Sequence, residues 1–305
     1  MQLTQIKTIL IAGAGTMGQQ TGLLCALNDY DVVIYDISDD ILSKGMARIK
    51  KNADRMTGFN LCTPEAADTA LSRISTTSDI KIAAKDADLV IESVPEDPEL
   101  KGRLFHDINQ CCKPDTIFTT NTSSLLPSMF ADQTGRPEKL CALHFHDVAI
   151  SKIVDVMPHA GTAKETVDIV TQFAEDLGQI PIVLTKENNG YVFNNMLMSF
   201  IGSALSLAAN QVAPIEEIDR SWMGVMHTLV GPFGIMDGIG LDTSWKVTDY
   251  WAEKRNDPQA KANAAFLKTY VDKGNLGIKT KQGFYTYPDP AFGKPDFLTP
   301  PKSKQ

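Results

Sequence analysis

The chain has 305 residues, of which 43% are hydrophobic and 22% are charged, and its formal net charge is −8. This length exceeds the usual size of one domain and the composition is that of a globular protein, so we expect two domains. The negative charge argues against nucleic acid or an anionic membrane as a main partner. Five scattered cysteines without a CxxC pair indicate reduced thiols. Because neither a signal peptide nor a bilayer-spanning stretch is apparent, we predict a cytoplasmic protein.

From Lys7 to about Leu184, short apolar segments alternate with amphipathic ones, which is typical of a parallel sheet covered by helices on both faces. The predicted strands are Thr8–Ala12, Val32–Tyr35, Ile74–Thr76, Leu89–Ser93, Thr116–Thr119, Leu140–Phe145, Ile153–Met157 and Gln179–Val183. The predicted helices are Met17–Asn28, Asp39–Met56, Pro98–Cys111 and Ala163–Leu177. Such sheets bind ligands at the carboxyl ends of their strands.

After Lys186 the sequence follows helical spacing and shows no convincing strand. The predicted helices are Tyr191–Asn210, Ile215–Thr228, Gly234–Arg255 and Ala260–Lys273. We therefore expect a Rossmann-like, doubly wound and mostly parallel α/β domain at residues 1–185, followed by an all-helical domain at 186–305. The helical part holds more apolar residues than roughly 120 residues bury alone, which favours a homodimer. We expect the tail from Tyr287, rich in Pro, Lys and Gly, to be loosely ordered.

A glycine motif directly follows the first predicted strand and opens a helix. Gly13 permits a tight turn, Gly15 lets the backbone approach a pyrophosphate, and Gly18 lets the helix pack closely on the strand. Thr16 and Met17 lie at the helix N-terminus, whose free N–H groups and partial positive charge favour phosphate. The motif predicts a dinucleotide site.

An acid follows the second predicted strand at the place where this fingerprint requires one. Asp36 can accept hydrogen bonds from both ribose hydroxyls of NAD and would repel the 2′-phosphate of NADP. No Arg or Lys follows within the next few residues, so NAD is favoured. The alternative is a Rossmann fold without a cofactor, in which Asp36 caps a helix.

Two histidines end the predicted strand Leu140–Phe145. His144 and His146 share one face by period-two alternation, near the carboxyl edge of the sheet. A histidine there can take a proton at neutral pH, or it can simply cap loop backbone. Asp155 follows on the next strand, where its carboxylate would fix the tautomer of an adjacent imidazole and stabilise the imidazolium. The spacing of these residues with Asp147 matches no compact ligand set, so we predict no metal.

Short polar side chains follow another predicted strand. Asn121–Leu125 reads NTSSL, and its hydroxyl and amide groups can hold a substrate oxygen or the carboxamide of a cofactor. The alternative is an ordinary N-cap before a helix at Leu125–Phe130, supplied by Ser123 or Ser124. Asn194 lies one turn into the first helix of the second domain and has a role only if it faces the cleft.

Together these residues resemble the L-3-hydroxyacyl-CoA dehydrogenase family. The matching segments run in family order over nearly the whole chain and are jointly highly specific. They are GAGTMG at Gly13–Gly18, Asp36, ESVPE at Glu92–Glu96 with Lys101, NTSSL, His144-Phe145, GYVFN at Gly190–Asn194, GPF at Gly231–Phe233, GLD at Gly240–Asp242, and KTKQGFY at Lys279–Tyr285.

The resemblance implies a Rossmann-like domain and a helical dimerisation domain with substrate between them. It implies that His144 is the acid/base, that Asp155 is its carboxylate partner, and that Ser123 and Asn194 bind the reacting oxygen. It further implies that Glu96, Lys101 and Lys279 line the NAD side. The resemblance alone assigns these three residues their role. The reaction would remove the hydroxyl proton as hydride leaves C3 for nicotinamide, giving a 3-oxo product.

The sequence departs from the family in two places. The family usually has Glu where Asp155 stands, and the segment before it is one residue shorter here. The family run HFFNP becomes HFHDV at His144–Val148, which loses an Asn that helps to bind cofactor and a Pro that shapes the loop. If Asp147 fills the Asn position, it can accept but not donate a hydrogen bond.

The resemblance supports CoA less strongly than NAD. Positions where relatives use a Ser and a Lys toward CoA hold Asn52 and Phe59, although Lys50, Lys51 and Arg55 are close in sequence. We expect an NAD-dependent 3-hydroxyacyl-CoA dehydrogenase for short chains. The alternatives are a dehydrogenase of a free 3-hydroxy acid, as in the gulonate and carnitine branches of the superfamily, and a non-catalytic NAD-binding protein.

Overall fold

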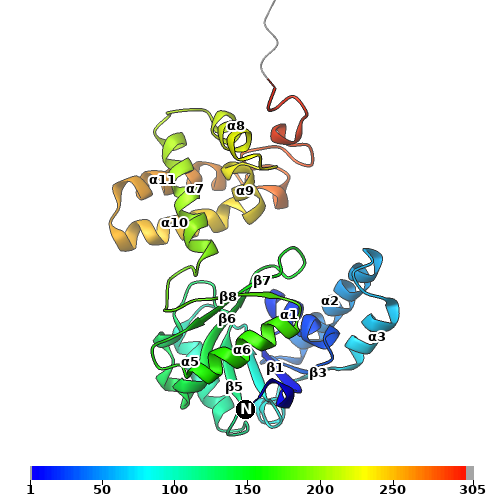
Figure 1. Cartoon of the computed structure of the whole chain (residues 1–305). Coiled ribbons are helices and arrows are strands. Elements are labelled where there is room, and N and C mark those ends of the chain that lie inside the picture. Colours follow the sequence, from blue (N-terminus) through cyan, green and yellow to red (C-terminus); the bar gives the residue numbers. More distant parts are fainter. Residues whose placement is uncertain (1, 300–305) are drawn as a thin grey trace, which may run out of the picture. The chain divides into compact units, whose positions relative to one another are not determined.

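The computed structural model describes residues 2–299, and these form two compact units (Figure 1). The first unit ends at Val192 and the second begins at Phe193. The first is a sheet covered by helices and the second is helical throughout, so the predicted fold class is confirmed. Among the described residues, no helix has both the length and the apolar character required to cross a membrane.

One eight-stranded sheet organises the first unit, in the order β3-β2-β1-β4-β5-β6-β7-β8. All neighbouring strands are parallel except β6 and β7, which are antiparallel. The strand bounds are β1 Thr8–Ala12, β2 Asp31–Tyr35, β3 Ile74–Thr77, β4 Leu89–Glu92, β5 Ile117–Thr120, β6 Leu140–Phe145, β7 Ile153–Pro158 and β8 Ile180–Val183. Each predicted strand is therefore present: β1 and β6 have the predicted bounds, and no end of the other strands is shifted by more than one residue.

Apolar cores fill both faces of this sheet. In β1, Ile9 and Ile11 pack into one core while Leu10 and Ala12 pack into the other, as expected for side chains that alternate along a strand. Burial on both faces explains why these strands read as continuous apolar runs. The helices of this unit are α1 Thr16–Leu27, α2 Asp39–Gly58, α3 Pro64–Ser72, α4 Ile80–Ala84, α5 Pro98–Asn109 and α6 Lys164–Asp176.

The structure contains two helices that the sequence analysis did not predict. α3 begins after Thr63, whose hydroxyl accepts a hydrogen bond from the Ala66 N–H, and Pro64 occupies its first turn. α4 begins after Asp79, whose carboxylate accepts from the N–H groups of Lys81 and Ile82. Both caps are ordinary start signals, but the helices are too short for a clear apolar period.

The second unit has its own apolar core. Its helices are α7 Phe193–Ala209, α8 Ile215–Met226, α9 Pro232–Ile239, α10 Leu241–Arg255 and α11 Pro258–Val271. The predicted single helix Gly234–Arg255 is wrong, because Gly240 has a φ of 101° and divides it into α9 and α10. The helical spacing of apolar residues continues across Gly240, so the sequence pattern did not indicate that two helices meet there.

The chain from Pro288 to Thr299 is mostly exposed, but it is anchored at Phe297, which the prediction of a loosely ordered tail did not anticipate. Phe297 is buried, and its carbonyl accepts a hydrogen bond from Arg220 Nε at 2.7 Å, while the Arg220 guanidinium covers the Phe297 ring. An aromatic side chain late in the sequence thus anchors the segment to α8. Residues 300–305, to which the same prediction applied, lie outside the described part.

Candidate active site

The turn between β1 and α1 has the geometry that a bound pyrophosphate requires. Gly13 has a φ of 112°, and a Cβ there would lie 2.6 Å from the Ser93 carbonyl oxygen. A Cβ on Gly18 would lie 1.9 Å from the Gly13 carbonyl oxygen. At Gly15, by contrast, an added Cβ would meet no described atom within 4 Å. Gly13 and Gly18 are therefore needed by the fold itself, whereas the bare backbone at Gly15 leaves space that a phosphate can fill.

Asp36, at the carboxyl end of β2, is tied to this turn. Its Oδ2 accepts a hydrogen bond from the Ala14 N–H at 2.8 Å, and its Oδ1 accepts from the Ile37 N–H at 2.8 Å. Each carboxylate oxygen keeps a second lone pair, so the side chain can still accept from ribose hydroxyls. The glycine turn and the acid that the sequence predicts for NAD therefore form one connected element.

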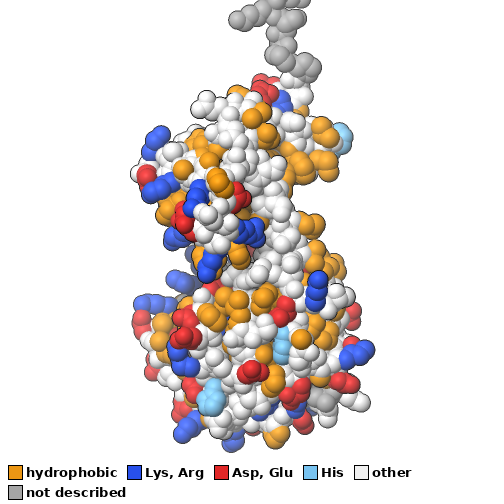
Figure 2. Space-filling model, turned by 90° about the vertical axis from the view of Figure 1, so that its left-hand side faces the viewer, with side chains coloured by type: hydrophobic (Ala, Val, Ile, Leu, Met, Phe, Trp, Pro, Cys, Tyr) orange, Lys and Arg blue, Asp and Glu red, His pale blue; other side chains and the backbone are white. Residues whose placement is uncertain are grey.

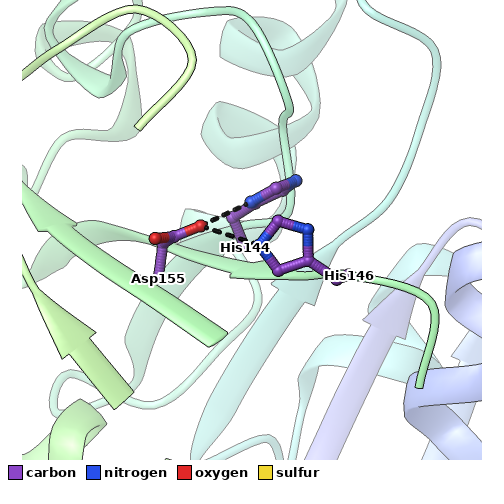
Figure 3. Close-up of side chains that lie close together, drawn as sticks. All are labelled: His144, His146 and Asp155. Carbon is purple, nitrogen blue, oxygen red and sulfur yellow. Dashed lines mark hydrogen bonds and ion pairs between the residues drawn. The ribbon is translucent and has the colours of Figure 1, made fainter. Parts of the chain in front are cut away.

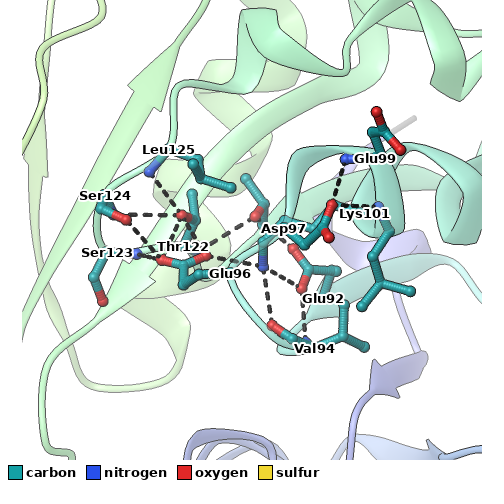
Figure 4. A network of polar contacts seen from close by, with 12 residues as sticks. Glu92, Val94, Glu96, Asp97, Glu99, Lys101, Thr122, Ser123, Ser124 and Leu125 are labelled. Carbon is teal, nitrogen blue, oxygen red and sulfur yellow. Dashed lines mark hydrogen bonds and ion pairs between the residues drawn. The ribbon is translucent and has the colours of Figure 1, made fainter.

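A buried ionic network lies beside the turn, where β4 ends (Figure 4). The Lys101 ammonium, from α5, lies 2.6 Å from Glu92 Oε1 and 3.2 Å from Glu96 Oε2. Lys101 and Glu92 are almost fully buried. Burial raises the pKa of Glu92 in spite of Lys101, whereas for Glu96 the effect of burial is outweighed by Lys101 and by donors from Thr122 and Ser123, which lower its pKa. Lys101 thus acts on the site by holding two carboxylates.

Glu96 fixes the predicted NTSSL loop. Its carboxylate accepts hydrogen bonds from the Thr122 hydroxyl at 2.8 Å and from the Ser123 N–H at 2.8 Å. The local cap is made by Thr122, whose hydroxyl accepts from the Leu125 N–H at 3.0 Å, rather than by Ser123 or Ser124. The helix expected at Leu125–Phe130 is a 3₁₀ turn at Pro127–Met129. Within the described chain the Ser123 hydroxyl is exposed and has no hydrogen-bond partner, so it can meet a ligand.

His144 and Asp155 stand opposite each other on β6 and β7 (Figure 3). His144 Nδ1 lies 3.0 Å from Asp155 Oδ2, and His146 Nε2 lies 3.2 Å from the same oxygen. Burial disfavours the charge of Asp155, but the two histidines outweigh this effect and lower its pKa. The ionised carboxylate can only accept, so both imidazoles donate to it. This leaves Nε2 of His144 as the acceptor for a substrate proton.

The His144 ring and the backbone after it are held by contacts that the sequence analysis did not predict. The Tyr191 ring stacks on it with centroids 4.5 Å apart and planes 8° apart, and the Tyr191 hydroxyl donates to the Thr122 carbonyl at 2.6 Å. Asn121 Oδ1 accepts from the Phe145 N–H at 2.7 Å. Tyr191 belongs to the GYVFN motif, which marked its importance without showing what it contacts.

Two of the predicted site residues belong to the helical unit. Asn194 lies in the first turn of α7, and the Lys279 ammonium forms an ion pair with Asp242 at 2.5 Å. Their predicted roles toward substrate and NAD stay predictions. The remaining predicted residues lie in the first unit: most follow or end β1, β2, β4, β5 or β6 at the carboxyl edge of the sheet, while Asp155 reaches this edge from β7 and Lys101 from α5.

Comparison with known proteins adds to this geometry. The family model described as 3-hydroxyacyl-CoA dehydrogenase, NAD binding domain, matches residues 8–188. The model described as 3-hydroxyacyl-CoA dehydrogenase, C-terminal domain, matches residues 190–287. The chain belongs to the 3-hydroxyacyl-CoA dehydrogenase family.

Individual members of this family match nearly the whole chain. A 3-hydroxybutyryl-CoA dehydrogenase of Bradyrhizobium diazoefficiens is 33% identical over 283 residues, which cover 92% of this chain and 96% of the relative. The structure of a diketoreductase that acts on dicarbonyl compounds has a TM-score of 0.87 at 35% identity, covering 92% of this chain and 99% of that one. The (S)-3-hydroxybutyryl-CoA dehydrogenase of Ralstonia eutropha has a TM-score of 0.84 at 30% identity, covering 93% and 100%.

Because the chain belongs to this family, the protein is an oxidoreductase with an NAD-binding domain. The geometry supports the same cofactor independently. The backbone at Gly15 leaves space for a phosphate, and the Asp36 carboxylate is hydrogen-bonded to the same turn.

Proposed function

We propose that the protein catalyses the reversible, NAD-dependent oxidation of a short-chain L-3-hydroxyacyl-CoA to the 3-oxoacyl-CoA. The observation that carries the proposal is the contact between His144 Nδ1 and Asp155 Oδ2, at the same edge of the sheet as the glycine turn. A base at the same sheet edge as a dinucleotide turn suits the oxidation of a secondary alcohol. The family and the named relatives support the acyl-CoA substrate class.

The side chains divide the work between proton transfer and positioning. His144 Nε2 accepts the hydroxyl proton, and Asp155 keeps the proton on Nδ1 and stabilises the imidazolium. The exposed hydroxyl of Ser123, with Asn194, would bind the reacting oxygen. Gly15 and Asp36 would hold the cofactor, which supplies hydride acceptance when it is bound. In the reducing direction, the same imidazolium returns the proton.

The substrate could instead lack CoA. The diketoreductase supports this second candidate, because it is 35% identical to this chain and acts on dicarbonyl compounds. The replacement of the expected CoA-facing Ser and Lys by Asn52 and Phe59 is consistent with it.

A substrate panel separates the two candidates. NADH absorbance is followed with 3-hydroxybutyryl-CoA, with free 3-hydroxybutyrate, gulonate and carnitine, and, in the reducing direction, with a dicarbonyl compound that lacks CoA. We expect kcat/KM to be largest for 3-hydroxybutyryl-CoA. Turnover confined to the compounds without CoA would refute the acyl-CoA assignment, and NADH binding without turnover of any compound would support a non-catalytic protein.

A further inference from the structure

The second histidine of the site is a departure from the family run HFFNP, in which Phe occupies the place of His146. In the structure His146 reaches Asp155 directly, at 3.2 Å from Oδ2, which is the oxygen that also serves His144 (Figure 3). The two imidazole rings meet edge to face, with centroids 4.8 Å apart. The departure therefore lies in contact with the proposed catalytic pair.

Both lone pairs of Asp155 Oδ2 are engaged by imidazole N–H groups. Its other oxygen, Oδ1, is buried and has no hydrogen-bond partner among the described residues. With one donor alone, the carboxylate could turn and exchange its two oxygens, since nothing described holds Oδ1. The second donor, His146, opposes this rotation. Aspartate also has one methylene fewer than the glutamate usual in the family, so its reach toward His144 depends more strongly on its orientation.

We propose that His146 is a positioning residue, which donates Nε2–H to Asp155 Oδ2 and thereby holds the short carboxylate in the orientation that supports His144. The inference rests on the proposed function, in which His144 is the acid/base. His146 touches neither reacting atom in this scheme and acts through Asp155. The departures at positions 146 and 155 then form one compensating pair.

The charged and titratable groups around the carboxylate agree with this assignment. His144 lies on β6, His146 directly follows that strand, and Asp155 lies on β7. Tyr191, in the segment before α7, stacks on the His144 ring. Burial raises the pKa of Tyr191 far above its ordinary value, so it stays neutral. Asp155 is thus the negative partner that the two imidazoles share.

The same three side chains could also hold a metal ion. One atom from each of His144, His146 and Asp155 lies within 4.8 Å of the others. A zinc ion bound there would occupy His144 Nδ1 in place of its proton. The two arrangements are separated by treating the enzyme with a chelator, because hydrogen bonding predicts full activity without metal and a metal site predicts its loss.

A double-mutant cycle tests the positioning role. His146→Phe should lower kcat about tenfold, the effect of losing one hydrogen bond to a charged group, with KM and NADH affinity unchanged. His146→Gln, which keeps a donor, should recover most of the rate, and so should the family pair His146→Phe with Asp155→Glu. In an Asp155→Ala background, His146→Phe should cost almost nothing, since its target is gone. His106→Phe, the same change at an exposed position of α5, should leave kcat unchanged.

Three results would overturn the proposal: an unchanged kcat in His146→Phe, an equal loss in both backgrounds, or activity that chelation abolishes and zinc restores. A readout without substrate keeps this test separate from the proposed function. In ¹⁵N-histidine spectra, neutral His144 should carry its proton on Nδ1 and His146 on Nε2, and Asp155→Ala should change both signals. If the tautomers agree but no 3-hydroxy compound turns over, the proposed function fails while the shared contact stands.

Discussion

At the scale of single residues, the central expectation concerns the base. His144→Ala removes the group that accepts the hydroxyl proton, so kcat should fall by about 10²–10⁴-fold, the usual contribution of a general acid or base. NADH affinity should stay nearly unchanged, because the glycine turn and Asp36 follow β1 and β2, whereas His144 lies on β6. Steady-state rates together with NADH fluorescence titration measure both quantities. Full activity in His144→Ala would remove the basis of the proposed mechanism.

The sequence revealed the proposed pair but not its surroundings. His144 and Asp155 could be predicted because one lies near the end of an apolar strand and the other near the start of the next, and pairing of these strands then places them together. The stacking of Tyr191 and the bond from the Phe145 N–H to Asn121 depend on how distant loops close over the sheet. No local pattern encodes such contacts. Lys101 shows a further limit, because its ion pairs with Glu92 and Glu96 became evident only from the structure.

At the scale of elements, the turn between β1 and α1 separates binding from folding. Gly15→Ala places a methyl where no described atom lies, so the melting temperature should stay the same while NADH binding weakens by about tenfold or more. Gly18→Ala drives its Cβ against the Gly13 carbonyl and should destabilise the fold by about 1–3 kcal/mol. Thermal unfolding and NADH titration of both variants check this contrast. Equal melting temperatures for the two variants would contradict it.

The packing of α5 against β4 depends on the buried ion pair between Lys101 and Glu92. Lys101→Met leaves Glu92 buried without its cation and should cost about 3–5 kcal/mol near neutral pH. Burial raises the pKa of Glu92, so the folded state binds its proton more tightly than the unfolded chain does. The loss should therefore grow as pH rises above the ordinary glutamate range and shrink in acid.

Urea unfolding at pH 5 and pH 7 measures this loss. The matched control is Arg103→Met on the same helix, where the ion pair with Glu99 is exposed and little change, within about 0.5 kcal/mol, is expected. A loss for Lys101→Met that did not depend on pH would show that packing, rather than the unpaired charge, accounts for it.

At the scale of the whole molecule, the sequence predicted the order and class of the two units better than their internal breaks. An alternating pattern and its change to helical spacing are properties of long segments, so they survive local irregularities. The break at Gly240 depends on one backbone angle, and α3 and α4 depend on single caps. Such features are set by one or two residues, so a hydrophobic pattern that extends over ten or more residues does not reveal them.

We propose that the helical unit forms a homodimer, as its apolar content suggested. Figure 2 shows hydrophobic side chains gathered on the surface of this unit, and Val225, Met226 and Leu229 near the end of α8 are 73%, 54% and 92% exposed. Large apolar side chains this exposed are costly in water unless a partner covers them.

Light scattering after gel filtration should give twice the chain mass of 33.3 kDa. Val225→Asp combined with Leu229→Asp should yield monomers, whereas Ile82→Asp, at a site in the first unit that is 65% exposed, should not. A monomeric wild type would rule out the dimer, and a dimeric double variant would rule out this surface.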